Sequence, residues 1–309
     1  MKKKIKIYQV DAFTNKAFGG NPAAVVFDAE ELSDEQMQKI ANEMALSETA
    51  FISKSYSDGY DYEVRFFTPT EEVDLCGHAT IGAFYLMAKL GLINSKEKVV
   101  TVKQKTLAGV LPVEIIFNKG TVSKVMMTQA KPKYLFTVEE IDELAKIMDI
   151  NKEDIGIDKF RGVPMAYSTG LPDIMLPVKN IEVLERIKPN FSLLSKYSKN
   201  KKVIGVHAFT LKDINKNIVL CRNFAPAYGI NEEAATGTSN GAMAAYLIEN
   251  KIVDFDKNID LICEQGHFIN RPSQIHVKIL RNGNEMTIKV GGEAVIIMEG
   301  TIFLNEVIK

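Results

Sequence analysis

The apolar residues of this chain fall into many short runs that suit β-strands and a few longer runs that suit helices. In the short runs, apolar or β-branched residues alternate or follow one another between turn residues, so we expect strands at residues 5–10, 23–27, 99–104, 111–117, 275–280 and 286–292. Capping boxes at residues 33–36 (SDEQ) and 137–140 (TVEE) precede apolar residues at helical spacing. We expect an amphipathic surface helix after each box.

Two further helical segments, residues 79–90 and 239–248, contain almost no charge on any face. A helix without a polar face has to be surrounded by protein, so we expect strands to wrap around each segment. Each segment begins at a glycine turn, at residues 76–78 and 236–238. The free backbone amides and the positive dipole end of such a turn suit a carboxylate or a phosphate, and the sequence therefore predicts two anion-binding turns.

A set of sequence landmarks recurs in the same order in both halves of the chain. There are four landmarks: a Gly-x-Pro turn with an apolar run, an Ala-Phe pair, an Arg-x-Phe-x-Pro unit and a glycine turn. In the first half they occupy residues 20–27, 50–51, 65–69 and 76–77, and in the second half residues 170–178, 208–209, 222–226 and 236–237. This order predicts two domains of one topology, residues 1–125 and 126–309, with a C-terminal strand at about 298–309 that packs back on the first. The expected fold class is α+β, each domain being a curved, mostly antiparallel sheet around a central apolar helix. If the halves pack about a pseudo-twofold axis, the two glycine turns face one another.

Composition and charge exclude several classes of partner. Among the 309 residues, 38 Lys and Arg balance 39 Asp and Glu, so no overall field favours a nucleic acid or an anionic membrane. Gln9 and Asp11 interrupt the apolar stretch that a signal peptide needs, and no apolar run is long enough to span a bilayer. Three cysteines far apart suit a reducing compartment, so we expect a cytoplasmic protein. The histidines lack metal-ligand spacing and no glycine-rich nucleotide motif is present, so no metal site and no nucleotide cofactor are expected.

Six blocks of the sequence are distinctive: DAFTNKAFGGNPAAVVF (residues 11–27), LSETAFI (46–52), VRFFTPTEEVDLCGHATIGA (64–83), STGLPDIMLPV (168–178), RNFAPAYGINEEAATGTSNGA (222–242) and EQGHFINRPSQI (264–275). Together they resemble the successive motifs of the PhzF family of phenazine-biosynthesis isomerases. The resemblance runs from end to end and implies the two-domain fold of diaminopimelate epimerase. It also implies a homodimeric isomerase that acts on a small carboxylate-bearing substrate without metal or cofactor.

Glu48 is the residue that we expect to act as acid and base. It follows an expected helix and precedes an apolar strand, where a carboxyl group partly withdrawn from water can accept and return a proton. Local sequence alone favours an exposed glutamate at a helix end, but the resemblance matches Glu48 to the family's catalytic glutamate. The repeat aligns Val206 with Glu48, so one base rather than two is expected. His78, which the resemblance also places in the site, would either hydrogen-bond a substrate carboxylate or exchange protons with Glu48.

The second glycine turn departs from the family pattern at two positions. Glu233 stands where the family usually has a catalytic aspartate, and Thr238 where it has a serine. A carboxylate displaced by ~1.5 Å changes which substrate is held correctly, because acid/base geometry is strict. Glu233 therefore either takes part in catalysis or only stabilises the helix dipole. The residues expected to contact the substrate from the turns are Asn21, Cys76, Gly77, Thr236 and Gly237. For Asn21 a purely turn-forming role is an equal alternative.

Two other functions remain open at the level of sequence. Related epimerases use two cysteines, one at each turn, whereas this chain has Cys76 at the first turn and Thr236 at the second. A threonine hydroxyl is too weak an acid to replace a thiol without activation, so Cys76 is expected to be a small buried residue beside the site. An amino-acid racemase or epimerase that pairs Cys76 with another group is the first alternative. The departures at Glu233 and Thr238 motivate the second, a non-catalytic protein that binds a small ligand.

Overall fold

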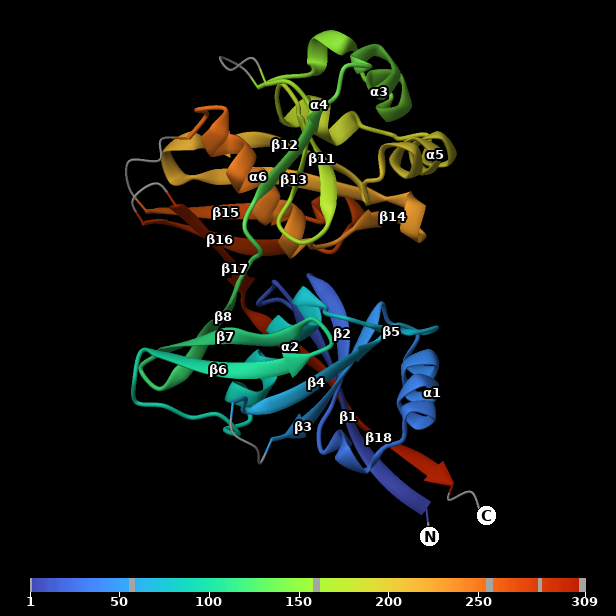
Figure 1. The fold of residues 1–309 in the computed structure, drawn as a ribbon, viewed down its shortest axis with the longest axis vertical. Helices are drawn as coiled ribbons and strands as arrows, with labels where there is room; N and C mark the ends of the chain where they lie inside the picture. Colours follow the sequence, from blue (N-terminus) through green and yellow to red (C-terminus); the bar gives the residue numbers. More distant parts are fainter. Residues whose placement is uncertain (1, 56–58, 158–161, 254–257, 283–284, 306–309) are drawn as a thin grey trace. The chain divides into compact units, whose positions relative to one another are not determined.

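The computed structural model of the chain describes residues 2–55, 59–157, 162–253, 258–282 and 285–305. The chain divides into two compact units (Figure 1). Unit 1 comprises Met1–Met127 and Gly291–Lys309, and unit 2 comprises Thr128–Val290. The C-terminal segment that completes unit 1 therefore begins at Gly291, before the strand that we had placed at about 298. No helix of the described segments has the length and apolar character needed to cross a bilayer.

Unit 1 is one sheet with a helix enclosed by it. Its elements are β1 (Lys2–Ala12), β2 (Asn21–Val26), η1 (Ala29–Glu31), α1 (Asp34–Met44), β3 (Glu48–Lys54), β4 (Tyr62–Phe67), β5 (Glu72–Val73), α2 (Gly77–Lys89), β6 (Val99–Thr106), β7 (Gly109–Asn118), β8 (Thr121–Thr128) and β18 (Ala294–Asn305). The strands pair in the order β18-β1-β2-β3-β4-β6-β7-β8, with β2–β3 and β4–β6 parallel and the other pairs antiparallel. The short strand β5 pairs with β4.

The central helix α2 explains the shape of this sheet. Residues 78–88 are all buried, and α2 packs against β1, β2, β3, β7 and β18 (Figure 1). A Cβ atom on Gly82 would lie 2.6 Å from Cγ2 of Val10, so glycine lets the helix approach β1 closely. On the outer side, α1 covers the sheet with Met37, Ile40 and Ala41. The expected arrangement of strands around an apolar helix is confirmed.

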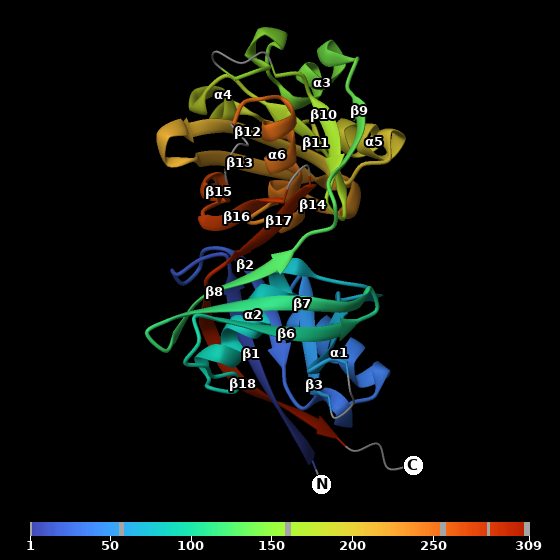
Figure 2. The same cartoon turned by 60° about the vertical axis from the view of Figure 1, so that its left-hand side comes forward.

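Unit 2 repeats this topology. Its elements are β9 (Lys133–Thr137), α3 (Ile141–Met148), η2 (Lys152–Asp154), β10 (Met165–Ser168), β11 (Pro172–Pro177), α4 (Ile181–Arg186), α5 (Phe191–Lys201), β12 (Gly205–Asp213), η3 (Ile214–Lys216), β13 (Ile218–Ala225), η4 (Pro226–Tyr228), β14 (Ile230–Glu233), α6 (Gly237–Glu249), β15 (Ile259–Gln265), η5 (His267–Ile269), β16 (Ser273–Asn282) and β17 (Glu285–Gly292). The order β9-β10-β11-β12-β13-β15-β16 again contains two parallel pairs, β11–β12 and β13–β15, separated by one antiparallel pair. Helix α6, buried over residues 239–247, takes the place of α2 (Figure 2).

The strand register corrects one alignment between the two units. Pro22 and Pro172 occupy equivalent turns, and the next residues pair with Glu48 in unit 1 and with Gly205 in unit 2. The pairing with the next strand gives the same alignment. Arg65 pairs with Phe51, three residues after Glu48, and the equivalent Arg222 pairs with Ala208, three residues after Gly205. The structural counterpart of Glu48 is therefore Gly205, not Val206. Matching the two Ala-Phe pairs by sequence had shifted the alignment by one residue.

The two expected helix caps have different outcomes. The box at residues 33–36 is confirmed: Ser33 caps α1, its side chain accepting from the backbone of Gln36 while the Gln36 side chain accepts from Ser33. The box at residues 137–140 is wrong. Thr137 is the last residue of β9, where it pairs with Met165, and α3 begins only at Ile141. Strand pairing holds Thr137 too far from the helix to cap it.

Two equivalent ion pairs fix the segments that lead into the glycine turns. Arg65 on β4 makes two hydrogen bonds of 2.7 Å with Glu72 on β5, and Arg222 on β13 makes bonds of 3.0 and 2.7 Å with Glu232 on β14. Arg222 also donates to the carbonyl oxygens of residues 184, 185 and 187. This symmetry agrees with a structural role for both arginines, which position the short strands before residues 76 and 236.

Candidate active site

Glu48 is the first residue of β3, and the end of α1 determines where it lies. Ala45 ends α1 in the left-handed conformation, with φ of 52°, and the chain then turns into β3 beside β2. The Glu48 side chain is 20% exposed, so it is neither in bulk water nor fully enclosed. Its Oε2 atom is buried and accepts no hydrogen bond from the described residues, although Nε2 of His78 lies 3.2 Å away. Glu48 thus presents one carboxylate oxygen to the first turn of α2.

His78 connects Glu48 to the start of α2. It is the second residue of the helix, only 9% exposed, and its Nε2 lies 3.3 Å from Oγ of Ser47. Burial lowers the pKa of His78 below its usual 6.5, while the Glu48 charge and the carbonyl group of Pro22 partly oppose this shift. The imidazole is therefore neutral near pH 7. A neutral ring has one N–H donor and one acceptor, which suits proton exchange with a neighbouring carboxylate.

The glycine turn itself places a thiol and an open surface beside this pair. Cys76 is the N-cap residue of α2, is 7% exposed, and has its Sγ 3.4 Å from Nδ1 of His78. Gly77 is exposed, and a Cβ atom built on it would meet no atom within 4 Å. The first amides of a helix have no partner within the helix. Unit 1 thus brings Glu48, Cys76, Gly77 and His78 together.

Asn21 lies on β2, the strand that pairs with β3 at Glu48. It is the first residue of β2 and is 5% exposed, and the carbonyl of the following Pro22 lies 3.5 Å from Oγ of Ser47. The turn before it requires glycine, because Gly20 has φ of 59° and a Cβ there would lie 2.1 Å from the Ala12 carbonyl oxygen. Asn21 is therefore held at the edge of the candidate site.

In unit 2, the equivalent turn contains the Glu233 carboxylate, which accepts a hydrogen bond from Thr236, the N-cap residue of α6. Thr236 donates from Oγ1 to Oε2 of Glu233 over 2.6 Å. Gln265 supports both groups, since its Nε2 donates to the Glu233 carbonyl over 2.8 Å and to the Thr236 hydroxyl over 3.0 Å. Gly237 follows, and the carbonyl of Thr238 accepts from Oγ1 of Thr169 over 2.8 Å. Glu233 and Thr236 are thus hydrogen-bonded to each other and to Gln265, and Gly237 and Thr238 follow them at the start of α6.

Beneath this turn lies a buried polar cluster that we had not predicted. Asp173, 2% exposed, accepts hydrogen bonds from Oγ of Ser239 and, over 3.1 Å, from Nδ2 of Asn223, while its Oδ1 has no partner among the described residues. Burial raises the pKa of Asp173 to about 6, and the donors, including the Gly205 amide, oppose the shift. His207, fully buried 3.2 Å from Asn223, has its pKa lowered by burial to about 3. The sequence did contain one sign of this cluster: Asp173 is a charged residue inside the apolar run PDIMLPV, and a buried charge needs polar partners.

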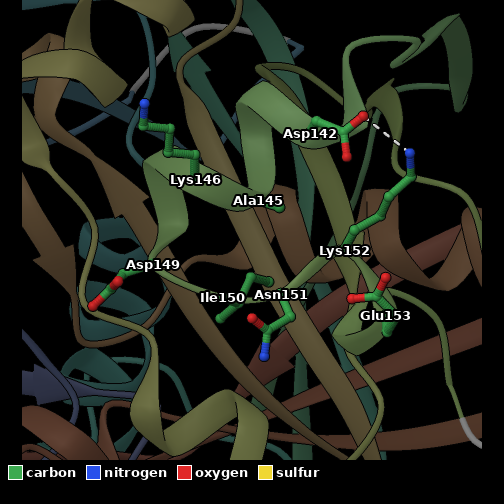
Figure 3. Close-up of a pocket in the computed structure, with 8 residues that line it drawn as sticks. All are labelled: Asp142, Ala145, Lys146, Asp149, Ile150, Asn151, Lys152 and Glu153. Carbon is green, nitrogen blue, oxygen red and sulfur yellow. Dashed lines mark hydrogen bonds and ion pairs between the residues drawn. The ribbon is translucent and has the colours of Figure 1, made fainter.

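A hollow of about 480 Å³ on the surface of unit 2 contains none of these residues (Figure 3). All of its lining residues come from the segment 142–153, at α3 and the turn after it. An exposed ion pair of 3.0 Å between Asp142 and Lys152 lies at one side (Figure 3). The hollow combines exposed charges of both signs without a nucleophile, a histidine or a buried carboxylate. It offers no chemistry comparable to that around Glu48.

Comparison with known proteins identifies the family. The model of the family described as "Phenazine biosynthesis-like protein", PhzC-PhzF, matches residues 10–300. An uncharacterized isomerase of Clostridium acetobutylicum is 38% identical over 99% of this chain and 100% of its own length. Trans-2,3-dihydro-3-hydroxyanthranilate isomerase of Pseudomonas chlororaphis is 30% identical over 96% of this chain and 98% of its own. The crystal structure of a Bacillus anthracis phenazine biosynthesis protein of the PhzF family superimposes with a TM-score of 0.85 and 33% identity, covering 97% of this chain and 99% of that one. The chain therefore belongs to the PhzC-PhzF family of phenazine biosynthesis-like proteins.

Proposed function

We propose that this protein is a cofactor-independent isomerase that moves a proton on a small carboxylate-bearing substrate, with Glu48 as acid and base. The observation behind this proposal is the Glu48 Oε2 atom, which is buried, accepts no hydrogen bond from the described residues and lies 3.2 Å from Nε2 of a neutral His78. A carboxylate oxygen without a donor retains its lone pairs for a substrate proton. Relatives that are named isomerases support the reaction class.

The proposed step is a proton transfer that changes no oxidation state of the substrate overall. Glu48 takes a proton from a carbon next to an unsaturated or carboxylate-bearing carbon, and the electron pair of the broken C–H bond shifts into the neighbouring unsaturated system. The protonated carboxyl group then returns the proton to another carbon of the same system. His78 hydrogen-bonds the Glu48 carboxylate or the substrate during this exchange.

The first glycine turn is proposed to bind an anionic part of the substrate. At the first turn, the open space over Gly77 gives a carboxylate access to the helix end beside Cys76, and Asn21 lies at the edge of the same region. Glu233, Thr236, Gly237 and Thr238 are assigned to catalysis or substrate recognition from their match to the family motif. The hydrogen bond from Thr236, which Gln265 supports, would position the Glu233 carboxylate.

The test is deuterium exchange with Glu48→Gln, which keeps the shape of the side chain and removes its basicity. Trans-2,3-dihydro-3-hydroxyanthranilate, the compound named for a relative, is the first substrate to try. In D2O the wild-type protein is expected to incorporate solvent deuterium into the product, as read by NMR. Glu48→Gln should lower this rate by about 10²–10⁴-fold, the contribution that a general base typically makes.

Glu48→Asp is the matched control, since it keeps the carboxyl group but shortens its reach. It should retain more exchange than Glu48→Gln while losing rate to misplacement. Exchange by Glu48→Gln at the wild-type rate would contradict the assignment of the base. Binding of the compound without exchange by the wild-type protein would favour a ligand-binding protein instead.

A racemase or epimerase that uses Cys76 is the second candidate. The observation that favours it is the 3.4 Å separation of Cys76 Sγ from Nδ1 of His78, a distance at which a histidine can activate a thiol. Cys76→Ala separates the two candidates. Loss of exchange in Cys76→Ala with retention in Glu48→Gln would indicate the thiol, and the reverse would indicate the carboxylate.

A further inference from the structure

We propose that Glu48, Cys76 and His78 form a binding site for a borderline-soft divalent cation of the zinc type. Each side chain contributes one donor atom, and the three atoms all lie within 4.8 Å of one another. Zinc sites in proteins are built from thiolate, imidazole and carboxylate groups, the three types present here. The sequence had predicted no metal site, because one ligand lies on β3 and the other two flank Gly77, without any metal-binding motif.

The distances fit a single ion. Zn²⁺ binds sulfur at about 2.3 Å and nitrogen or oxygen at about 2.0–2.2 Å, so tetrahedral ligand atoms lie roughly 3.3–3.7 Å apart. In unit 1, Nε2 of His78 is 3.2 Å from Oε2 of Glu48 and 3.9 Å from Sγ of Cys76. A tetrahedral site therefore needs only side-chain adjustments of a few tenths of an ångström for these two pairs. The third pair is Oε2 of Glu48 and Sγ of Cys76, which lie no more than 4.8 Å apart. The two atoms have to move closer together if they are wider apart than the tetrahedral spacing.

The backbone holds these groups in place without a metal. Glu48 is fixed by the parallel pairing of β3 with β2, while Cys76 and His78 belong to the N-cap and first turn of the buried helix α2. The Glu48 Oε2 atom is buried without a hydrogen-bond donor among the described residues, which is an unsatisfied state for a carboxylate oxygen. A cation would satisfy it.

Three protein ligands leave one position of a tetrahedral ion open. Ser47 is exposed and has Oγ 3.3 Å from Nε2 of His78, and the surface over Gly77 is open, so a water molecule or a substrate carboxylate can reach the ion. Catalytic zinc sites in other proteins likewise have three protein ligands and a fourth position for water or substrate. The ion would occupy the Glu48 lone pair that the proposed isomerase needs. Inhibition by the metal therefore rests on the proposed function, whereas binding of the metal does not.

Cobalt is the probe, since Co²⁺ takes the place of Zn²⁺ and its spectrum identifies the ligands. The full-length protein, reduced and freed of metal with EDTA, is titrated with Co²⁺ alone. We expect a near-ultraviolet charge-transfer band from thiolate to cobalt and intense visible bands of a tetrahedral ion, saturating at one equivalent and abolished by excess Zn²⁺. Cys76→Ser should remove the charge-transfer band, and His78→Asn should reduce cobalt affinity at least tenfold.

Cys263→Ser is the matched control. Cys263 lies on β15 in unit 2 and is fully buried, so its substitution should leave the cobalt spectrum unchanged. Circular dichroism of each variant separates a lost ligand from a lost fold, and His78→Asn tests the site independently if Cys76→Ser does not fold. Absence of the band in the wild-type protein, or its persistence in folded Cys76→Ser, would overturn the site.

The activity arm distinguishes failure of the metal site from failure of the proposed function. Zn²⁺ should lower the rate of deuterium incorporation in proportion to the occupied fraction seen in the cobalt competition, and EDTA should restore it. A protein that binds the ion by its spectrum and still exchanges at full rate would retain the metal site and refute Glu48 as the base. A protein that exchanges but shows no cobalt band would refute the metal site alone.

Discussion

Substitution of Asp173 by asparagine should change how the stability of unit 2 depends on pH. Asp173 is 2% exposed and keeps one carboxyl oxygen without a partner among the described residues, so its charged form is poorly solvated. Burial raises its pKa from 3.8 to about 6. The variant Asp173→Asn keeps the shape of the side chain and an oxygen that can accept from Ser239, and it removes the titration.

The sign follows from the direction of the shift. A carboxyl group with a raised folded-state pKa favours folding fully only below its unfolded pKa of 3.8, and this contribution is lost as the pH rises through about 6. With these two values the penalty at about pH 8 is ~3 kcal/mol, and at about pH 5 it is ~1.6 kcal/mol. Between about pH 5 and about pH 8, the free energy of unfolding of the wild-type protein should therefore fall by ~1.4 kcal/mol relative to that of Asp173→Asn.

Only a difference between the two proteins isolates this term, because His207 acts in the opposite direction. Burial lowers the pKa of His207 from 6.5 to about 3, so its contribution to stability is present above about pH 6.5 and is lost on acidification. Both proteins contain His207, and His207 contacts Asn223 rather than Asp173 in this cluster. Subtracting the two stability curves removes the part of the His207 contribution that is equal in both proteins, whereas any coupling through Asn223, which also donates to Asp173, stays in the difference.

The assay is urea unfolding followed by circular dichroism at about pH 5, 6.5 and 8, at constant ionic strength. If the two units unfold in separate transitions, the difference belongs to the transition of unit 2, which contains Asp173. The free energy of unfolding of wild type minus variant should fall as the pH rises. A difference that stays constant, or that grows with pH, would refute the argument that the buried carboxyl group resists ionisation.

Three further substitutions test the packing near the glycine turns and along α2, with urea unfolding as the measurement. Arg222→Met should cost about 3–5 kcal/mol, because it leaves the Glu232 carboxylate, 8% exposed, buried without its partner. Arg65→Met should cost less than half as much, since that pair is 27% and 21% exposed, and equal losses would contradict the role of burial. Gly82→Ala should destabilise unit 1 by about 1–3 kcal/mol through its 2.6 Å contact with Val10, despite the better helix propensity of alanine, and a stabilised variant would show that α2 can move.

Much of the fold was predictable because the repeated landmarks mark positions that the topology itself requires. The two helices with almost no charge, the glycine turns and the strands follow from local patterns, and the helices and turns have the same place in both units. The register between strands was not predictable in this way. Matching Ala50-Phe51 to Ala208-Phe209 gave Val206 as the counterpart of Glu48, whereas hydrogen-bond pairing gives Gly205. A shift of one residue in a strand reverses which face a side chain occupies, and sequence similarity alone does not detect it.

The buried cluster in unit 2 shows a different limit of sequence reasoning. The side-chain donors to Asp173 are Ser239 on α6 and Asn223 on β13, which come from distant parts of the chain. Only the folded unit brings them together, and a single acidic residue in an apolar run does not indicate its partners. The neighbourhood of Glu48 was easier to anticipate, because His78 and Cys76 lie in one short motif at the start of a helix.

Each unit has one carboxyl group on its first pair of parallel strands, β2–β3 in unit 1 and β11–β12 in unit 2. The carboxyl group lies on the second strand of the pair in unit 1 and on the first strand in unit 2. In unit 1 the registered residues are Ala23 and Glu48, and in unit 2 they are Asp173 and Gly205. A Cβ atom on Gly205 would lie 1.8 Å from the Phe224 carbonyl oxygen, so no glutamate can occupy that position without displacement of β13. Asp173 is enclosed instead, whereas Glu48 stays 20% exposed. The close approach of two strands in unit 2 is thus the physical reason to expect a reaction with one base rather than two.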